Sequence, residues 1–237
     1  MFINNWIDGS NPLGSGDFQV IACQARLALT DRLTVFADKD GYAFIHPNQL
    51  LASSEGWLNL NAGLKYQLIR DVENQFMVTA GTMYEFQSGE AGAFQSQGSG
   101  NFTFFGTAGK EIADVNHLLV NFAFQLPVDR VYNSSYFFTQ LHVDRQMFGW
   151  LYPLAELNWY HYASGGNWGI PNALGEGDGL INIGTSGVGG NDLVTAALGL
   201  KARLCWNVET AVVWEKPISN RQDLIGDRLI AELILRY

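Results

Sequence analysis

The feature that most constrains this chain is an alternation of apolar and polar residues that recurs in one run after another. In an extended strand, residues i, i+2 and i+4 lie on the same face, so alternation gives a strand one apolar and one polar face. The last run, 228–237, carries its apolar face on Leu229, Ala231, Leu233, Leu235 and Tyr237. Its polar face holds Arg228, Glu232 and Arg236. The pattern predicts an all-β protein.

Eleven strands are predicted from runs of this kind, near 18–29, 33–45, 57–69, 75–87, 101–112, 117–129, 135–146, 150–162, 192–205, 207–218 and 228–237. Very short polar turns join them in pairs, and longer segments rich in Gly, Ser, Asn and Pro separate the pairs. Short turns at one end and long loops at the other are typical of bacterial outer-membrane barrels, whose turns face the periplasm. Because such barrels carry an even number of strands, we expect a further strand at 2–8.

A membrane-spanning helix is excluded by the sequence, because no apolar run approaches the roughly 18 residues that such a helix needs. A closed barrel is the other structure that satisfies every backbone group in lipid. The charged fraction of 16% is low, which is consistent with a surface that is not fully wet. We therefore interpret residues 1–237 as a single antiparallel transmembrane β-barrel domain of about twelve strands. Residues 1–6 lack the features of a secretory signal, so we expect a processed or trimmed N-terminus.

A soluble antiparallel sheet would show the same alternation, with its apolar face inward. Three features favour the membrane. The apolar faces run through nearly every strand over about 9–11 residues, the length of a tilted bilayer crossing. Aromatic residues gather near strand ends, as in interfacial girdles, at Tyr66, Phe76, Tyr84, Phe86, Trp159, Trp214 and Tyr237. The polar faces carry opposite charges at high density, as a solvated lumen would.

The polar faces predict a set of pore-lining ionisable residues. They are Arg26, Asp38, Lys65, Glu85, Glu111, His142, Asp144, Glu156, Lys201, Arg203, Glu209, Glu215, Arg228, Glu232 and Arg236. Basic residues concentrate on 192–205 and 228–237, with the acidic strand 207–218 between them, so cross-strand charge pairs are expected. These pairs either fix the structure of the lumen or set a transverse field that selects solutes.

Three lysines, Lys39, Lys110 and Lys216, fall on the lipid-facing side of their strands. A charge at the bilayer midplane costs about 2–4 kcal/mol, and the cost falls toward zero at the interface. All three lie toward strand ends, so we expect snorkelling or a local bulge to relieve them.

Two segments resemble known outer-membrane proteins. The hairpin "ARLALTDRLTVFAD", residues 25–38, resembles a hairpin recurrent in outer-membrane proteins described as transporters linked to meta-pathway phenol degradation. The terminal "LIAELILRY" is similar to the signal that the barrel-insertion machinery reads. The resemblance implies a barrel of about twelve strands in the bacterial outer membrane and uptake of small, aromatic or hydrophobic molecules.

The predicted function is a pore or channel for small solutes, with outer-membrane lipid around it. A barrel with a filled lumen that serves a structural or binding role is the first alternative. A lipid hydrolase is the second: His142 and Asp144 share a face, but no matching serine is evident, and Ser164 lies in a flexible loop. We expect no enzyme activity. The glycine-rich segment 163–191 is predicted either to fold inward as a gate or to form an external flap.

Other sites and partners are not expected. The net charge of −9 argues against nucleic-acid binding. Cys23 and Cys205 fall on strands that are not neighbours, so they are interpreted as small packing residues. The segment 38–41 lacks the glycine and glutamate of a calcium loop, and no other metal or cofactor motif is present.

Overall fold

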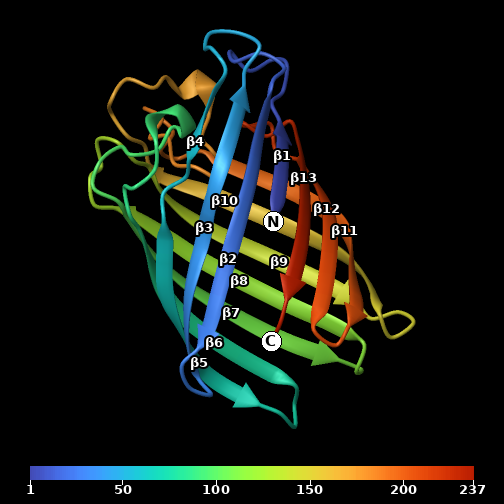
Figure 1. The fold of residues 1–237 in the computed structure, drawn as a ribbon. Helices are drawn as coiled ribbons and strands as arrows, with labels where there is room; N and C mark the ends of the chain where they lie inside the picture. The colour runs from blue at the N-terminus through green and yellow to red at the C-terminus, as the bar shows by residue number, and fades with distance from the viewer.

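The computed structural model covers residues 1–237 and describes every side chain except that of Lys39. Along the described backbone, thirteen strands form one antiparallel sheet (Figure 1). The strands are β1 Phe2–Trp6, β2 Asp17–Ala28, β3 Leu33–His46, β4 Ser54–Trp57, β5 Asn61–Asp71, β6 Phe76–Glu85, β7 Asn101–Ile112, β8 Asn116–Pro127, β9 Ser135–Arg145, β10 Leu151–Ser164, β11 Asp192–Cys205, β12 Val208–Pro217 and β13 Asp227–Leu235.

The helical content is two single-turn 3₁₀ helices, η1 Ala91–Ala93 and η2 Asn172–Leu174. Among the described residues, no helix is long and apolar enough to cross a membrane.

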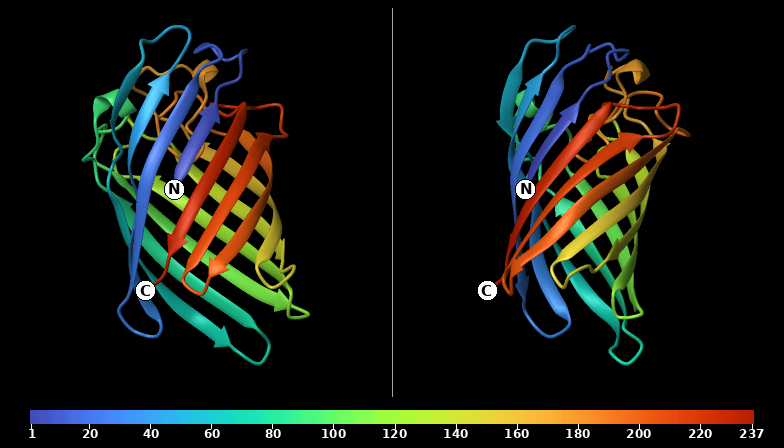
Figure 2. Two further views of the ribbon diagram at one scale, coloured as in Figure 1. Left: turned by 45° about the vertical axis from the view of Figure 1, so that its right-hand side comes forward. Right: turned by 90° about the vertical axis from the view of Figure 1, so that its right-hand side faces the viewer.

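The sheet closes into a barrel because the short strand β1 pairs on both sides. Ile3 lies opposite Ile230 of β13 and opposite Val20 of β2. Strands β4 and β5 both pair with β3, one along Tyr42 to Ile45 and the other along Leu33 to Asp38, so together they occupy one position in the wall. The barrel therefore has twelve strands around its circumference, as predicted (Figure 2). The predicted strand at 2–8 is confirmed by β1.

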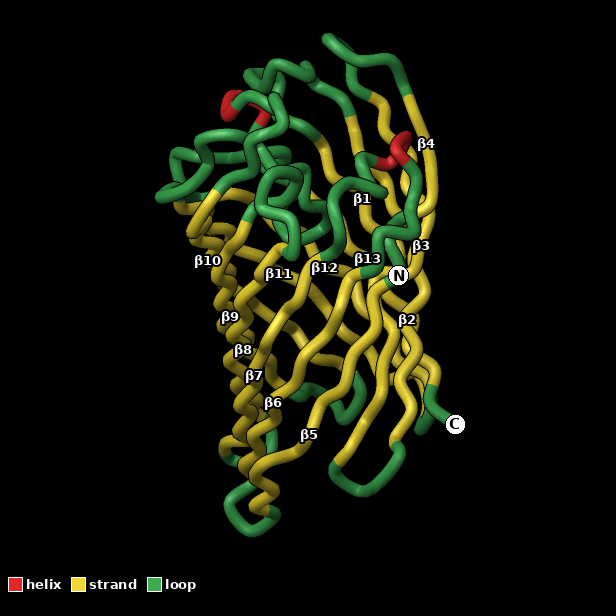
Figure 3. Tube along the Cα trace, turned by 90° about the vertical axis from the view of Figure 1, so that its left-hand side faces the viewer, coloured by secondary structure: helices red, strands yellow, loops and turns green.

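Connections of different length are segregated to the two ends of the barrel (Figure 3). The turns 29–32, 72–75, 113–115, 146–150 and 206–207 lie at one end, called the turn end. The segments 7–16, 47–53, 86–100, 128–134, 165–191 and 218–226 lie at the other, called the loop end. In the turn between β7 and β8, Ala113 and Asp114 both have positive φ, of 54° and 59°. That backbone twist matches the twist of the strands it joins.

One predicted strand, 57–69, is wrong in its first part. The structure breaks it at residues 58–60. Alternation along 57–69 places Leu58 on the same apolar, outward face as Leu64, but Leu58 turns to the interior with 3% exposure. The reason is a pair of hydrogen bonds at the break. The Asn59 side chain donates to Glu85 at 2.8 Å, and the Asn59 backbone N–H donates to the Gln95 side chain at 3.2 Å. These bonds pull the chain inward and change which residues face outward on either side of the break.

The outer surface of the barrel carries a continuous set of exposed apolar side chains. Leu64, Val120, Leu198 and Val212 are typical members, between 40% and 69% exposed. Tryptophans lie toward both ends of this surface, with Trp214 stacked on Trp6 at 5.4 Å near the loop end and Trp206 in a turn at the other. The apolar faces predicted from alternation are therefore the outer face of the barrel.

Two of the outward lysines have partners. The Lys216 ammonium lies 3.3 Å from the Asp227 carboxylate, and the Lys110 ammonium donates to the backbone carbonyl of Asn74. Both lie at strand ends, as expected. The prediction for Lys39 concerns a side chain that lies outside those described.

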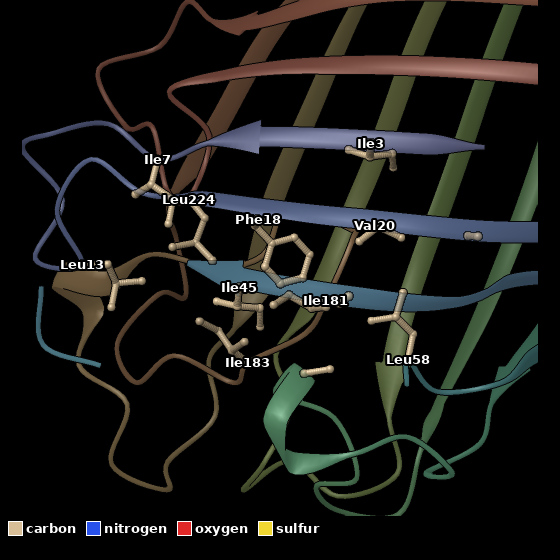
Figure 4. Packing of buried hydrophobic residues seen from close by; sticks show 13 residues of the cluster. Ile3, Ile7, Leu13, Phe18, Val20, Ile45, Leu58, Ile181, Ile183 and Leu224 are labelled. Atoms are coloured by element: carbon tan, nitrogen blue, oxygen red, sulfur yellow. The ribbon is translucent and has the colours of Figure 1, made fainter. Parts of the chain in front are cut away.

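Apolar residues also fill the loop-end half of the interior beside β1 to β3. Phe18, Val20 and Ile45 point inward there and form one buried cluster with Ile181 and Ile183 of the segment 165–191 (Figure 4). The expectation that the interior face is occupied mainly by charges is wrong on these strands. The reason is that residues 165–191 enter the barrel at this end and pack against these strands as a buried apolar core.

Candidate functional site

The segment 165–191, called the inward loop, folds into the loop end of the barrel. Glu176 is 2% exposed, Thr185 is 0% exposed and Val188 is 0% exposed. Asn182 exchanges hydrogen bonds with the backbone of Ser134 at 2.7 and 2.8 Å. The segment predicted at 163–191 is therefore folded inward rather than external, and its role as a gate stays a prediction.

Glu176 organises the inward loop. Its carboxylate accepts hydrogen bonds from the Ser134 hydroxyl at 2.5 Å, the Thr185 N–H at 2.6 Å and the Ile183 N–H at 3.2 Å. Burial raises the pKa of Glu176 above its ordinary value, although the hydrogen bonds from these donors lower it. Burial, with the nearby Asp223 carboxylate, raises the pKa of Asp178 well above its ordinary value. Two carboxyl groups of the loop are therefore held away from water.

A buried ion pair lies beside the inward loop. The Arg228 Nη1 is 3.3 Å from the Glu215 carboxylate, and both side chains are less than a tenth exposed. Asn158 donates to Glu215 at 3.1 Å, and the Thr195 hydroxyl donates to the same oxygen. The Nε and Nη2 of Arg228 have no hydrogen-bond partner among the described residues. One edge of this guanidinium is thus unpaired.

A cavity of about 290 Å³, called the mid-lumen pocket, lies directly beneath the inward loop. Its walls include Tyr136, Phe138, Tyr160, Asp178, Leu180 and Arg228. The rings of Phe138 and Tyr160 are 4.7 Å apart, so they form a continuous aromatic surface. This pocket is mostly apolar, unlike the charged lumen expected from the sequence.

A second aromatic pair crosses the lumen face of β5 and β6. Phe36 of β3 meets Phe105 of β7 with ring centroids 5.7 Å apart. The two strands between them carry Gly63 and Gly81, where an added Cβ would lie 2.7 Å from Phe36 and 2.4 Å from Phe105. The rings can meet because those two positions have no side chain.

A hydrogen-bonded chain of polar side chains runs along the lumen face of β7 to β10. The Thr107 hydroxyl bonds Asn121 at 2.7 Å, and Asn121 donates to Gln140 at 2.6 Å. Gln140 donates to Glu156 at 3.1 Å, and Glu156 bonds His142 at 2.6 Å. This side of the lumen is therefore polar and internally satisfied.

The chain ends in a charged cluster at the turn end. His142 lies 3.2 Å from Asp144, the Lys201 ammonium lies 2.9 Å from the same carboxylate, and His117 contacts its other oxygen. Asp144 itself is 5% exposed. The cluster combines residues of β8, β9 and β11 around one carboxylate.

The basic residues beside this cluster are held in place by their own partners. Glu209 accepts two hydrogen bonds from Arg236, at 2.7 and 2.9 Å, and one from Arg203 at 3.3 Å. Lys201 and Arg203 lie 4.7 and 5.6 Å from the centre of the Tyr152 ring. A cavity of about 460 Å³ opens between Glu111, Asp144 and Arg203 at this end.

The predicted pore-lining residues divide into two groups. The turn-end group comprises Arg26, Lys65, Glu111, His142, Asp144, Glu156, Lys201, Arg203, Glu209, Glu232 and Arg236. The group nearer the inward loop comprises Asp38, Glu85, Glu215 and Arg228. The expected pairs between the last three strands form at Glu209 and Glu215. Lys201 instead reaches Asp144 across β10, a contact that neighbouring-strand pairing did not predict.

The sequence reasoning missed the aromatic residues of the lumen. The signal was present, since Phe105 has the same strand parity as Glu111, and Phe138 the same parity as His142. Residues of the same parity in one strand share a face, so Phe105 and Phe138 were expected on the lumen face with those ionisable residues. The predicted pore-lining set contained only ionisable residues, so it did not include these two phenylalanines.

The structure separates the residues that were considered for the hydrolase alternative. His142 is bonded to Glu156 and Asp144 at the turn end, whereas the Ser164 hydroxyl bonds Ser135 at the loop end. These residues are at opposite ends of β10 and its neighbour. No cluster of three or more His, Cys, Asp or Glu side chains suited to a metal ion is found among the described residues. Cys23 and Cys205 are free and exposed.

Comparison with known proteins shows the fold. No family model matches this chain. None of the curated proteins matches it in sequence. Among solved structures, it is similar to an outer membrane channel from Pseudomonas putida F1 with a TM-score of 0.66, at 10% identity, over 100% of this chain and 93% of that one. It is also similar to the KdgM porin with a TM-score of 0.55, at 10% identity, over 100% of this chain and 98% of that one. At this identity the likeness concerns architecture, namely the closed outer-membrane type of barrel.

Proposed function

We propose that this chain is a bacterial outer-membrane channel through which small solutes diffuse, with its turn end in the periplasm and its loop end outside. The observation that carries the proposal is a closed barrel with an apolar outer surface and an interior that holds cavities on the path below the inward loop. Both structural neighbours named above are themselves described as a channel and a porin. Strand β13 is proposed to carry the signal for the barrel-insertion machinery.

The solutes are proposed to be small and partly hydrophobic or aromatic. The aromatic walls of the mid-lumen pocket support this, because they offer apolar contact along the path. The resemblance of residues 25–38 to the phenol meta-pathway transporters points in the same direction.

The direct test is conductance in planar lipid bilayers. We predict stepwise currents from the purified protein, and larger unit steps from a variant that lacks residues 176–184. The Thr185 hydroxyl donates to the Gly175 carbonyl, so this excision rejoins two positions already in contact. Removing the exposed Leu50 and Leu51 from a loop-end segment outside the core is the matched control and should leave the step size unchanged.

The second candidate is a barrel with a filled lumen that binds or supports rather than conducts. The buried cluster of Phe18, Ile45 and Ile183 favours it, because it occupies part of the interior. This candidate predicts that both the intact chain and the shortened variant remain silent although they are folded. Silence of both forms would overturn the channel proposal.

A further inference from the structure

Two basic side chains of the turn-end lumen have no acidic partner. Arg26 of β2 and Lys65 of β5 have no carboxylate oxygen within 4.0 Å among the described residues. The Nη2 of Arg26 donates to the side chain of its near neighbour Gln24 at 3.3 Å. Arg26 also repels Lys65 electrostatically. Two positive charges are therefore held near each other without a negative charge to offset them.

The register of the strands brings these two cations to one part of the wall. Strands β2, β3 and β5 are neighbours there (Figure 1). Arg26 lies opposite Phe36, and Thr34 lies opposite Lys65. Directly opposed residues of neighbouring strands point to the same face, so all four share the lumen face of Phe36. Neighbouring strands are about 4.8 Å apart, so the two long basic side chains can both reach one ion above Thr34.

The other basic residues of the turn-end lumen are offset by carboxylates. Lys201 lies 2.9 Å from Asp144, and Arg203 and Arg236 both bond Glu209. The positive charge that has no partner is therefore concentrated on the β2 to β5 side of the lumen.

The remaining carboxyls of the lumen do not reach this pair. Glu111, Glu156 and Glu232 belong to β7, β10 and β13, and Asp38 of β3 lines the mid-lumen pocket. None of the four has an oxygen within 4.0 Å of either cation. An anion that enters this part of the lumen therefore meets donors before it meets acids.

Both cations are accessible to such an anion. Arg26 is exposed, and Lys65 and Thr34 are partly exposed. Arg26 also lines, with Gln24 and Arg236, a cavity of about 310 Å³. Among the described residues that line this cavity, none is acidic.

We propose that Arg26, Thr34 and Lys65 bind a small anion in the turn-end lumen and make the channel pass anions more readily than cations. The selectivity rests on the proposed channel function, whereas the binding site does not. An anion between the two cations offsets their repulsion, and the Thr34 hydroxyl adds a neutral donor. Lys and Arg side chains that line a pore favour the passage of anions in the same way.

The first test is the reversal potential of the reconstituted channel in a potassium chloride gradient. The permeability ratio of chloride to potassium should exceed one in the wild type. Each of Arg26→Gln and Lys65→Gln should lower this ratio by roughly two- to threefold, the effect of one unit charge several ångströms from an ion in water. Lys65→Glu should lower it further than Lys65→Gln. Because neither cation has a carboxylate partner, these changes leave no acid unpaired and the variants should fold.

Arg145→Gln is the matched control and should leave the ratio unchanged. Arg145 lies near the same end of the barrel and also has no carboxylate within 4.0 Å among the described residues. It has the strand parity of Val143, which is 43% exposed on the outer face, so it points away from the lumen. A wild-type ratio of one or less, or a ratio unchanged in the double variant of Arg26→Gln with Lys65→Gln, would overturn the proposed selectivity.

Binding is measured separately by the line broadening of the chloride NMR signal on the folded barrel in detergent. The wild type and Arg145→Gln should broaden the signal equally, and the double variant should broaden it much less. Broadening by a barrel that stays electrically silent would retain the anion site and overturn the channel. Equal broadening by the wild type and the double variant would overturn the site, whether or not the barrel conducts.

Discussion

At the scale of single residues, the packing of side chains in the lumen depends on glycines as much as on charged residues. Gly63 and Gly81 lie beneath the rings of Phe36 and Phe105, and their missing Cβ atoms leave the space that the rings fill. Pairing of an aromatic ring over a strand glycine restores the packing that the glycine lacks. The contact joins β3 to β7 across two intervening strands.

Substitution at Gly81 tests this packing. In Gly81→Ala the new Cβ would lie 2.4 Å from Phe105 and 2.4 Å from the Leu64 carbonyl, so the ring and the backbone must shift. We predict that the variant is less stable to unfolding by about 1–3 kcal/mol, the usual cost of overpacking. Denaturant titration in lipid vesicles measures it. Gly106→Ala is the matched control, since its Cβ would meet nothing closer than 3.6 Å and should change the stability little.

At the scale of elements, the inward loop decides how much of the lumen is open. It is held by hydrogen bonds that converge on Glu176 and by apolar contacts of Ile181 and Ile183. Loops are usually solvated because their backbone groups need partners. This one is buried because side chains such as Asn182 and Glu176 supply those partners.

The docking of the inward loop should weaken as the pH rises. Docking raises the pKa of Glu176 and Asp178, so a loop that leaves the barrel loses protons at a lower pH than a docked one. The stabilisation is complete below the ordinary carboxyl pKa of about 4 and is lost as the pH rises through the raised values. Hydrogen exchange of residues 181–188, corrected for intrinsic rates, should therefore accelerate with pH in this window. Asp178→Asn with Glu176→Gln should flatten the dependence, and an unchanged slope would contradict the role of these carboxyls.

At the scale of the whole molecule, the barrel is inverted relative to a soluble one, with apolar groups outside. Six of the seven tryptophans, all except Trp168, are at least 38% exposed. Trp6, Trp57, Trp159 and Trp214 lie toward the loop end, and Trp150 and Trp206 lie in turns. This arrangement forms two girdles of the kind that anchors proteins at membrane interfaces.

Lipids with brominated acyl chains should quench most of the tryptophan emission of the reconstituted barrel. The reason is that the six exposed rings should contact lipid in the reconstituted barrel, whereas Trp168 donates its indole N–H to the Ile183 carbonyl within the loop end. Trp168→Phe should leave the quenched fraction nearly unchanged or slightly higher. Emission that is insensitive to brominated lipid would indicate that the apolar surface does not meet the bilayer.

The sequence by itself determined the architecture. Alternation with period two fixes which side chains share a face, and the contrast between short turns and long segments fixes the order of the strands; the twelve-stranded barrel follows from these local patterns. It also predicted that the ionisable residues lie on the lumen face. Tertiary structure alone decided the break at Leu58, the contact of Lys201 with Asp144, the entry of residues 165–191 and the unpaired edge of Arg228. Each of these depends on contacts between segments far apart in the chain, which no local period encodes, because closure of the barrel brings them together.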